Sequence, residues 1–184
     1  MGLKPARTMR VIKKQAWTRF SKRKPRKSFV KAMPHMAIQI TSMGAVHGDY
    51  THTVELVAKD ALQVRDNALE ASRQAANKFL EAKIPLGYHL FLRVYPHHVV
   101  REIKMVFGAG ADRIQKGMKH AWGKPSERVA RIRPNLPIFT ARCVEKDLGL
   151  MGEAFRRAKA KLPGRYAVRI RADAAPSGEA LLEG

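Results

Sequence analysis

The sequence has a single cysteine, few acidic residues and no long hydrophobic run. Cys143 has no second cysteine to pair with, which excludes an intramolecular disulfide and a structural zinc site built on paired thiolates. Histidine, glycine or charged residues interrupt the longest apolar stretches, which excludes a membrane-spanning helix. The first residues lack the continuous apolar segment of a secretory signal, so we expect a protein of a reducing compartment.

The shortage of acidic residues sets the charge of the protein. Only 15 aspartates and glutamates oppose 36 lysines and arginines, so the 184 residues carry a formal net charge of +21. Like charges in this excess repel one another, and a polyanionic partner relieves that repulsion. Hydrophobic residues still make up 45% of the chain, which is enough for a folded core. The composition therefore predicts one domain with tails that binds a polyanion.

Charge also divides the chain into three parts. Residues 1–35 contain no acid and no regular hydrophobic period, and we predict a basic N-terminal arm whose conformation is set by what it binds. Residues 36–171 are predicted to form a single α+β RNA-binding domain, and residues 172–184 a flexible tail without a base. A solvated solubility tail and an organellar transit peptide are alternatives for the arm. The cations of the arm that we expect to bind ribosomal RNA are Lys4, Arg7, Arg10, Lys13, Lys14, Arg19, Lys22, Arg23, Lys24, Arg26 and Lys27.

Hydrophobic periodicity predicts strands, a helix, further strands, a second helix and a last strand. Asp60 is predicted to be the N-cap of a helix over 61–83, and a 3,4,3,4 spacing predicts the second helix over 148–162. Alternating apolar residues indicate strands at 36–40, 53–58, 88–94, 99–105, around Val129 and Ile132, and at 138–144 and 166–171. This order predicts a mixed α+β fold with two helices packed on a sheet.

The glycine-rich segment before Gly123-Lys124 invites a nucleotide-binding interpretation, which its residues do not support. A Walker A loop needs glycine where Met118 stands and a hydroxyl where Pro125 stands. Arg113 likewise occupies the place of the third small residue in a dinucleotide-binding fingerprint. We therefore expect no nucleotide and no other cofactor.

Candidate catalytic and metal-binding residues are sparse. His97 and His98 are neighbours on a predicted strand, where side chains point to opposite faces, so they cannot chelate one metal unless Pro96 kinks the backbone. Cys143 lies in an apolar strand and is predicted to be a buried structural thiol. The carboxylates are scattered rather than paired, so we expect neither an enzyme nor a metal site. An RNA-modifying enzyme that uses His97, His98 or His120 is one alternative.

Basic charge outside the arm forms two further groups. The first lies between residues 101 and 133, and its expected RNA-binding residues are Arg101, Lys104, Lys119, Lys124 and Arg128. The second comprises Arg156, Arg157, Lys159, Lys161, Arg165, Arg169 and Arg171, of which Arg165 is the nominated RNA-binding residue. No helix-turn-helix, zinc-finger or RNP motif accompanies them. The pattern favours an irregular folded RNA that is recognised by shape and phosphate.

Five strings are distinctive when taken together in this order: KPAR at 4–7, YPHHVVREIKM at 95–105, GAGADRIQKGM at 108–118, GKP at 123–125 and RRAKAKLPGR at 156–165. They resemble the universal large-subunit ribosomal protein sixteen family, in its archaeal and eukaryotic ten-e branch. The resemblance covers about residues 4 to 171, although residues 12–32 and the tail carry no string of the family.

The resemblance implies an α/β-hammerhead fold and a structural constituent of the large subunit, cytoplasmic and ribosome-bound, without enzyme activity. It implies contact with large-subunit rRNA near the aminoacyl-tRNA site and the peptidyl transferase centre, and help in positioning tRNA. Other large-subunit proteins are implied partners, and a membrane is not. The loop that approaches tRNA corresponds to Gly108, Ala109, Gly110, Ala111, Asp112, Arg113, Ile114, Gln115, Lys116, Gly117 and Met118. A ribosome-assembly factor that binds RNA transiently is the alternative.

Overall fold

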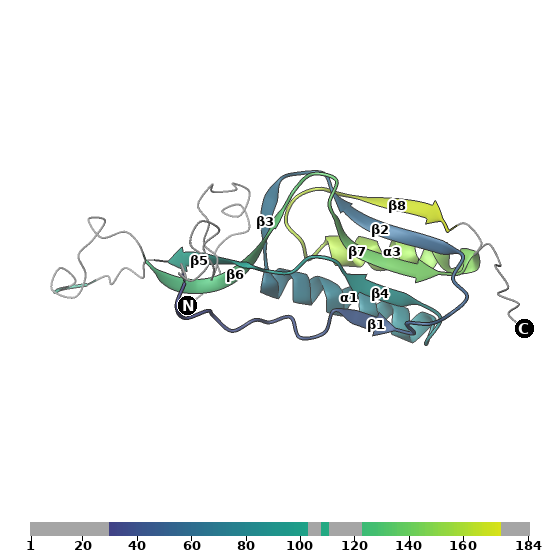
Figure 1. The fold of residues 1–184 in the computed structure, drawn as a ribbon, viewed down its shortest axis with the longest axis horizontal. Helices are drawn as coiled ribbons and strands as arrows, with labels where there is room; N and C mark the ends of the chain where they lie inside the picture. Colours follow the sequence, from purple (N-terminus) through teal and green to yellow (C-terminus); the bar gives the residue numbers. More distant parts are fainter. Residues whose placement is uncertain (1–29, 103–107, 111–122, 174–184) are drawn as a thin grey trace, which may run out of the picture.

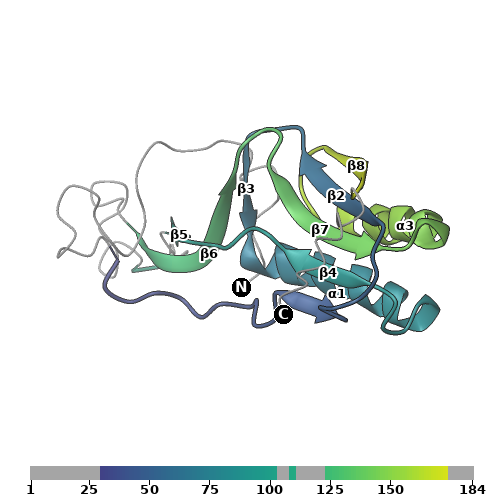
Figure 2. The same ribbon diagram turned by 45° about the vertical axis from the view of Figure 1, so that its right-hand side comes forward.

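The computed structural model describes residues 30–102, 108–110 and 123–173. Most of the arm, most of the glycine-rich loop and the C-terminal tail lie outside these residues, and so do the predictions made for them. Within the described residues, two helices lie against one face of a five-stranded sheet, and a three-stranded sheet continues from one end of it (Figures 1 and 2). The predicted α+β class with two helices packed on a sheet is confirmed.

The five-stranded sheet is antiparallel throughout, and most of its strands were predicted. Its strands occur in the order β1 (Ser42–Gly44), β4 (His89–Leu92), β7 (Pro137–Cys143), β2 (His52–Ala58) and β8 (Tyr166–Ala172). In β4, Leu90 and Leu92 are buried, whereas His89 and Phe91 are half-buried. The alternation of apolar residues in the sequence therefore indicates which face of the sheet is covered.

The three-stranded sheet corrects the predicted start of the first helix. It contains β3 (Leu62–Arg65), β6 (Lys124–Ile132) and β5 (His98–Glu102). Helix α1 therefore spans only Asp66–Lys83. Leu62 and Val64, which fit a helical stripe, instead pair with Ile132 and Ala130 of β6. A nonlocal ladder has overridden the local period, so Asp60 is not the N-cap.

The predicted strand at 36–40 is also wrong. Ile38 is buried, but Ile40, which would share its face in a strand, is 54% exposed, and residues 36–40 form no ladder in the described chain. The strand begins only at Ser42, where β4 supplies the pairing partner. Alternating apolar residues in the sequence therefore do not make this segment a strand, because no described strand pairs with it.

The core lies between the sheet and the two helices. Helix α3 (Leu148–Lys159) follows a short 3-10 turn, η3 (Glu145–Asp147), and packs beside α1. Each large side chain buried there stabilises the fold by about 1.5–3 kcal/mol. No helix among the described residues is long and apolar enough to cross a membrane. The core includes Val54, Leu56, Leu69, Ala76, Leu80, Leu90, Phe139, Ala141, Met151, Ala154, Phe155 and Ala158.

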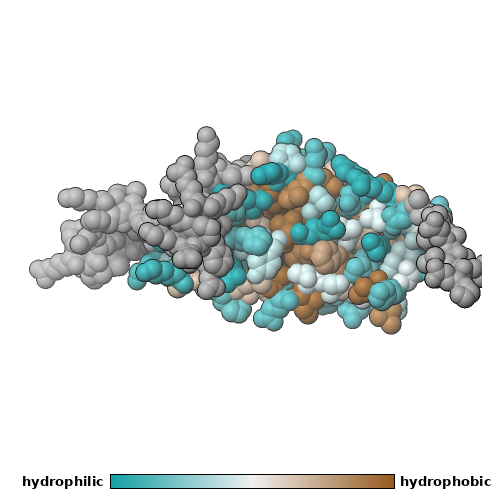
Figure 3. Space-filling model, in the orientation of Figure 1, coloured by the Kyte–Doolittle hydropathy of each residue, from teal (hydrophilic) through white to brown (hydrophobic). Residues whose placement is uncertain are grey.

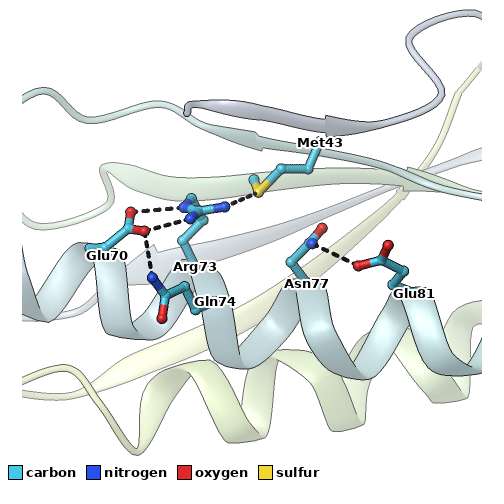
Figure 4. Close-up of polar contacts among 6 residues, drawn as sticks. All are labelled: Met43, Glu70, Arg73, Gln74, Asn77 and Glu81. Carbon is cyan, nitrogen blue, oxygen red and sulfur yellow. Dashed lines mark hydrogen bonds and ion pairs between the residues drawn. The ribbon is translucent and has the colours of Figure 1, made fainter. Parts of the chain in front are cut away.

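A polar contact ties α1 to the edge strand β1 (Figure 4). Arg73 is 9% exposed, and its guanidinium donates two hydrogen bonds to the Glu70 carboxylate and one to the Met43 sulfur, at 3.0 Å. The hydrogen bond from Arg73 lowers the pKa of Glu70 and the same bond raises the pKa of Arg73. Both groups therefore stay charged, and the buried cation is neutralised by its own helix.

Replacement of Phe155 tests the position of the core. Phe155→Ala removes a fully buried ring and is expected to lower the free energy of unfolding by about 3–5 kcal/mol. Urea denaturation of the pure protein measures this. The matched control is Val168→Ala on β8, where the side chain is 43% exposed and the expected loss is under about 1 kcal/mol. Equal losses in the two variants would contradict the core described here.

Candidate nucleic-acid interface

The hairpin of β5 and β6 carries three of the nominated RNA-binding residues, Arg101, Lys124 and Arg128. A register shift lies between Val100 and Arg101, after which Glu102 pairs with Lys124. Arg101 donates a hydrogen bond to the Gly123 carbonyl at 3.1 Å. This bond holds the two ends of the glycine-rich segment together, and residues 108–110 lie beyond this end of the ladder (Figure 1).

Glycine at 123 is required by the backbone. Gly123 has φ +66, and a Cβ there would lie 2.8 Å from the carbonyl carbon of Glu102. Gly110 differs, because its φ is +83 but no described atom lies within 4 Å of its ideal Cβ. Gly123 closes the hairpin, whereas Gly110 supplies a left-handed conformation at an exposed position.

Arg128 has a structural role in addition to its charge. Its Nε donates to the Pro34 carbonyl at 2.6 Å, and the Ala37 amide donates to the Asp66 carboxylate at 3.0 Å. These two bonds fix the end of the arm and the residues that follow it along β6 and the start of α1. Arg128 keeps further guanidinium donors besides Nε, so this contact is compatible with a phosphate contact.

Arg165 is held by an ion pair that the sequence did not predict. Its side chain donates to both oxygens of Asp60, at 3.1 and 2.8 Å, and its amide donates to the same carboxylate at 3.2 Å. Asp60, the expected helix cap, therefore anchors the turn before β8 instead. The pair neutralises a nominated RNA-binding cation, although the Arg165 side chain is 78% exposed.

The last basic group of the sequence is divided between two surfaces. Arg156 and Arg157 lie on α3, where they border a groove between α1 and α3 and pair with Glu153. Hydrogen bonds from Arg156 and then Arg157 lower the pKa of Glu153 to about 2, and the Arg157 guanidinium also lies 4.2 Å from the centre of the Phe79 ring. Arg169 and Arg171 belong to β8, on the sheet.

Sequence reasoning missed Arg142. This exposed arginine follows buried Ala141 and precedes buried Cys143 in β7, so alternation points it away from the core. It was passed over because it stands alone among apolar residues rather than in a basic run. Its position in a predicted strand was the available signal.

The described histidines do not form a catalytic or metal centre. His97 is exposed and its ring lies 4.6 Å from that of Tyr95, while His98 is half-buried in β5. His89 contacts the Ser42 hydroxyl at 2.9 Å, but within the described part of the chain no carboxylate bonds to His89 to complete a triad. No group of three histidines, cysteines or carboxylates in residues 30–102, 108–110 and 123–173 could hold a metal ion. His120 lies outside these residues.

Comparison with known proteins identifies relatives of similar length. The family model described as ribosomal protein L16p/L10e matches residues 17–169. The chain is 43% identical to the large ribosomal subunit protein uL16 of Staphylothermus marinus over 164 residues, which covers 89% of this chain and 90% of the relative. The uL16 protein of Methanococcus aeolicus is 40% identical over 171 residues, covering 92% and 95%, and that of Archaeoglobus fulgidus is 39% identical over 164 residues, covering 89% and 90%.

The thiol of Cys143 provides a test of its assigned structural role. Burial, followed by the charges of Asp147 and Asp173, raises the pKa of Cys143 from 9.0 to about 11, so at neutral pH the thiolate is scarce. Iodoacetamide is expected to alkylate the native protein at least about 100-fold more slowly than the urea-unfolded protein. Mass spectrometry of timed samples measures both rates. Equal rates would show a reactive, accessible thiol.

Proposed function

The chain belongs to the ribosomal protein L16p/L10e family, and from this premise we propose that it is a structural constituent of the large ribosomal subunit, bound to large-subunit rRNA. The observation that carries the proposal is the similarity to archaeal uL16 proteins, close to 40% identity along nearly the full length of each chain. The net charge of +21 supports it, because each cation brought to a phosphate releases a counterion.

The finer part of the proposal concerns position in the ribosome. We place the protein near the aminoacyl-tRNA site and the peptidyl transferase centre, where it helps to position tRNA through the loop from Gly108 to Met118. Small residues allow a backbone to approach RNA closely, and Arg113 and Lys116 supply charge for phosphate. The arm contributes further contacts with rRNA, and other large-subunit proteins are its neighbours.

The proposed role is non-catalytic and ribosome-bound in the cytoplasm. The loose distribution of carboxylates and the isolated Ser42 and His89 pair give no assembled acid, base and nucleophile in the described residues. The sheet and helices instead form a rigid body from which the hairpin of β5 and β6 presents the loop. Function on this proposal comes from placement of charge rather than from chemistry.

Sedimentation tests the proposal. The native protein is expected in large subunits and in polysomes, in a constant ratio to them, after cell extract is run on a magnesium-containing sucrose gradient and after a moderate-salt wash. Magnesium depletion, which dissociates polysomes into subunits, is the control and must leave the protein with the large subunit. Its presence only in immature particles would favour an assembly factor, and its presence only at the top of the gradient would contradict a ribosomal role.

Gly110→Val tests the role of the loop. Valine is strained at φ +83, so the loop backbone must move, whereas the core lies elsewhere and stays folded. We expect subunits that contain the variant to bind aminoacyl-tRNA and form peptide bonds more slowly, with an unchanged melting temperature of the free protein. Gly149→Val, at a glycine without positive φ on the exposed side of α3, is the control. Normal peptide synthesis with Gly110→Val would argue against the loop role.

A further inference from the structure

The five-stranded sheet has one face that no described helix covers. Strand alternation identifies it, because Leu90, Ala141 and Val54 enter the core beneath α1 and α3 and the residues between them point the opposite way. The strands lie in front of both helices in Figure 1. Figure 3, in the same orientation, shows hydrophilic side chains interspersed with hydrophobic ones over this face.

Strand register brings arginines from different parts of the sequence into one row. Arg171 of β8 pairs with Thr53 of β2, Thr53 pairs with Arg142 of β7, and Arg142 pairs with His89 of β4. Paired residues in antiparallel strands point to the same face, and adjacent strands are about 4.8 Å apart. The two arginines therefore lie on either side of Thr53, with about 10 Å between their Cα atoms.

Two described acids lie at this face. Asp173 accepts a hydrogen bond from the Thr53 hydroxyl at 2.7 Å, and Glu55 stands in the next row. Glu55 pairs with Arg169 on one side and Thr140 on the other, and Thr140 pairs with Phe91. The Glu55 carboxylate lies 3.8 Å from Arg171 and 4.0 Å from Arg169, beyond hydrogen-bond distance. One carboxylate is thus shared by two arginines whose side chains are 57% and 44% exposed.

The lowered pKa of His89, beside Arg142, also indicates an excess of positive charge on this face. Burial lowers the pKa of His89, and the nearby charges of Arg142 and His47 lower it further. The neutral form of His89 is therefore favoured, and its Nε2 lies 2.9 Å from the Ser42 hydroxyl, within hydrogen-bond distance. The cationic groups here outnumber the acids, and an anion bound at the row would lessen their repulsion.

We propose that the open face of the sheet, formed by Thr53, Arg142, Arg169 and Arg171, binds the phosphodiester backbone of RNA. The proposal rests on the proposed ribosomal function and adds a surface separate from the loop. Guanidinium groups match phosphate with paired donors, and the half-buried ring of Phe91 is suited to contact with an unstacked base. The Thr53 hydroxyl donates to the Asp173 carboxylate at 2.7 Å, so the arginines supply the donors for phosphate.

RNA fits this face better than an acidic protein does. The arginines come from two strands on opposite sides of β2, and a protein would need clustered carboxylates at a matching separation. RNA carries a phosphate at each nucleotide, so a backbone that crosses the strands meets both positions. Two pockets of the described residues lie away from this face, one between α1 and α3 and one beside Asp60.

The groove between α1 and α3 provides a comparison surface that is also positively charged. Lys78, Lys83, Lys161 and two arginines border it, but Ala75, Ala82 and Ala160 make much of its lining apolar. Glu153 already holds both arginines, at 2.7 and 3.0 Å. If net charge alone determined RNA binding, removal of two cations from this groove would have the same effect as removal from the sheet.

Two charge-matched variants separate these cases. Arg142→Gln/Arg171→Gln alters the open face and leaves Arg169 beside Glu55, while Lys78→Gln/Lys161→Gln alters the groove by the same charge. Filter binding of the full-length chain to deproteinised large-subunit rRNA, over a series of potassium chloride concentrations, gives the slope of log affinity against log salt. We expect the slope to fall in magnitude by about 1.4–1.8 in the sheet variant and to be unchanged in the groove variant.

Three results would overturn the proposal. Equal slope changes in both variants would show an effect of net charge without a site. An unchanged slope in the sheet variant would show that the face does not contact phosphate. An unchanged slope combined with loss of the sheet variant from large subunits on the gradient would assign the face to a protein neighbour. None of these results bears on the proposed ribosomal function. That function is tested separately, by sedimentation of the wild-type protein, and it fails only if the wild-type protein is absent from large subunits.

Discussion

The fold depends on the burial of one face of the five-stranded sheet beneath α1 and α3. A chain with a net charge of +21 gains no stability from its average electrostatics, so apolar burial has to outweigh the repulsion. The core contains the inward-facing residues of the strands and one stripe of each helix. Its polar neighbours are paired locally, as Arg73 is with Glu70 (Figure 4). Among the described residues, other cations lie on the hairpin of β5 and β6, on α3 and on the open sheet face.

Sequence periodicity predicts the elements whose hydrophobic pattern is set by local structure. It gives a wrong prediction where pairing with a strand distant in the sequence determines the structure. The strands at β2, β4, β7 and β8 and the helix α3 follow from period alone, because each has one covered face. The first helix begins six residues after the predicted cap, Asp60, since β6 draws Leu62–Arg65 into a ladder that local periodicity cannot report. Residues 36–40 pair with no strand among the described residues, so they are not part of either sheet.

The candidate interface was predictable in composition but not in arrangement. Runs of lysine and arginine identified the hairpin and α3, and the structure shows that Arg128 and Arg165 also hold the chain together. Arg142 stands in no basic run, and its importance arises from register with Thr53 and Arg171, which are far apart in the sequence. A basic run therefore finds charge, while only the strand order shows which charges share a surface. The split of the last basic group between α3 and β8 has the same origin.

Strand pairing and the binding of a polyanion have opposite effects on the electrostatic repulsion at this surface. The pairing that completes the sheet brings Arg142 and Arg171 to either side of β2, with Arg169 in the next row, and the two described acids of this face, Glu55 and Asp173, offset only part of the resulting repulsion. A polyanion that binds the folded row and not the unfolded chain stabilises the fold by RT ln(1 + [L]/Kd), or about 2.7 kcal/mol at a hundredfold excess of ligand over Kd. The same arginines that weaken the free sheet then strengthen it in the complex. On the proposed function, the edge strand β8 is therefore held most firmly when its exposed face meets RNA, and stability becomes a property of the assembled particle.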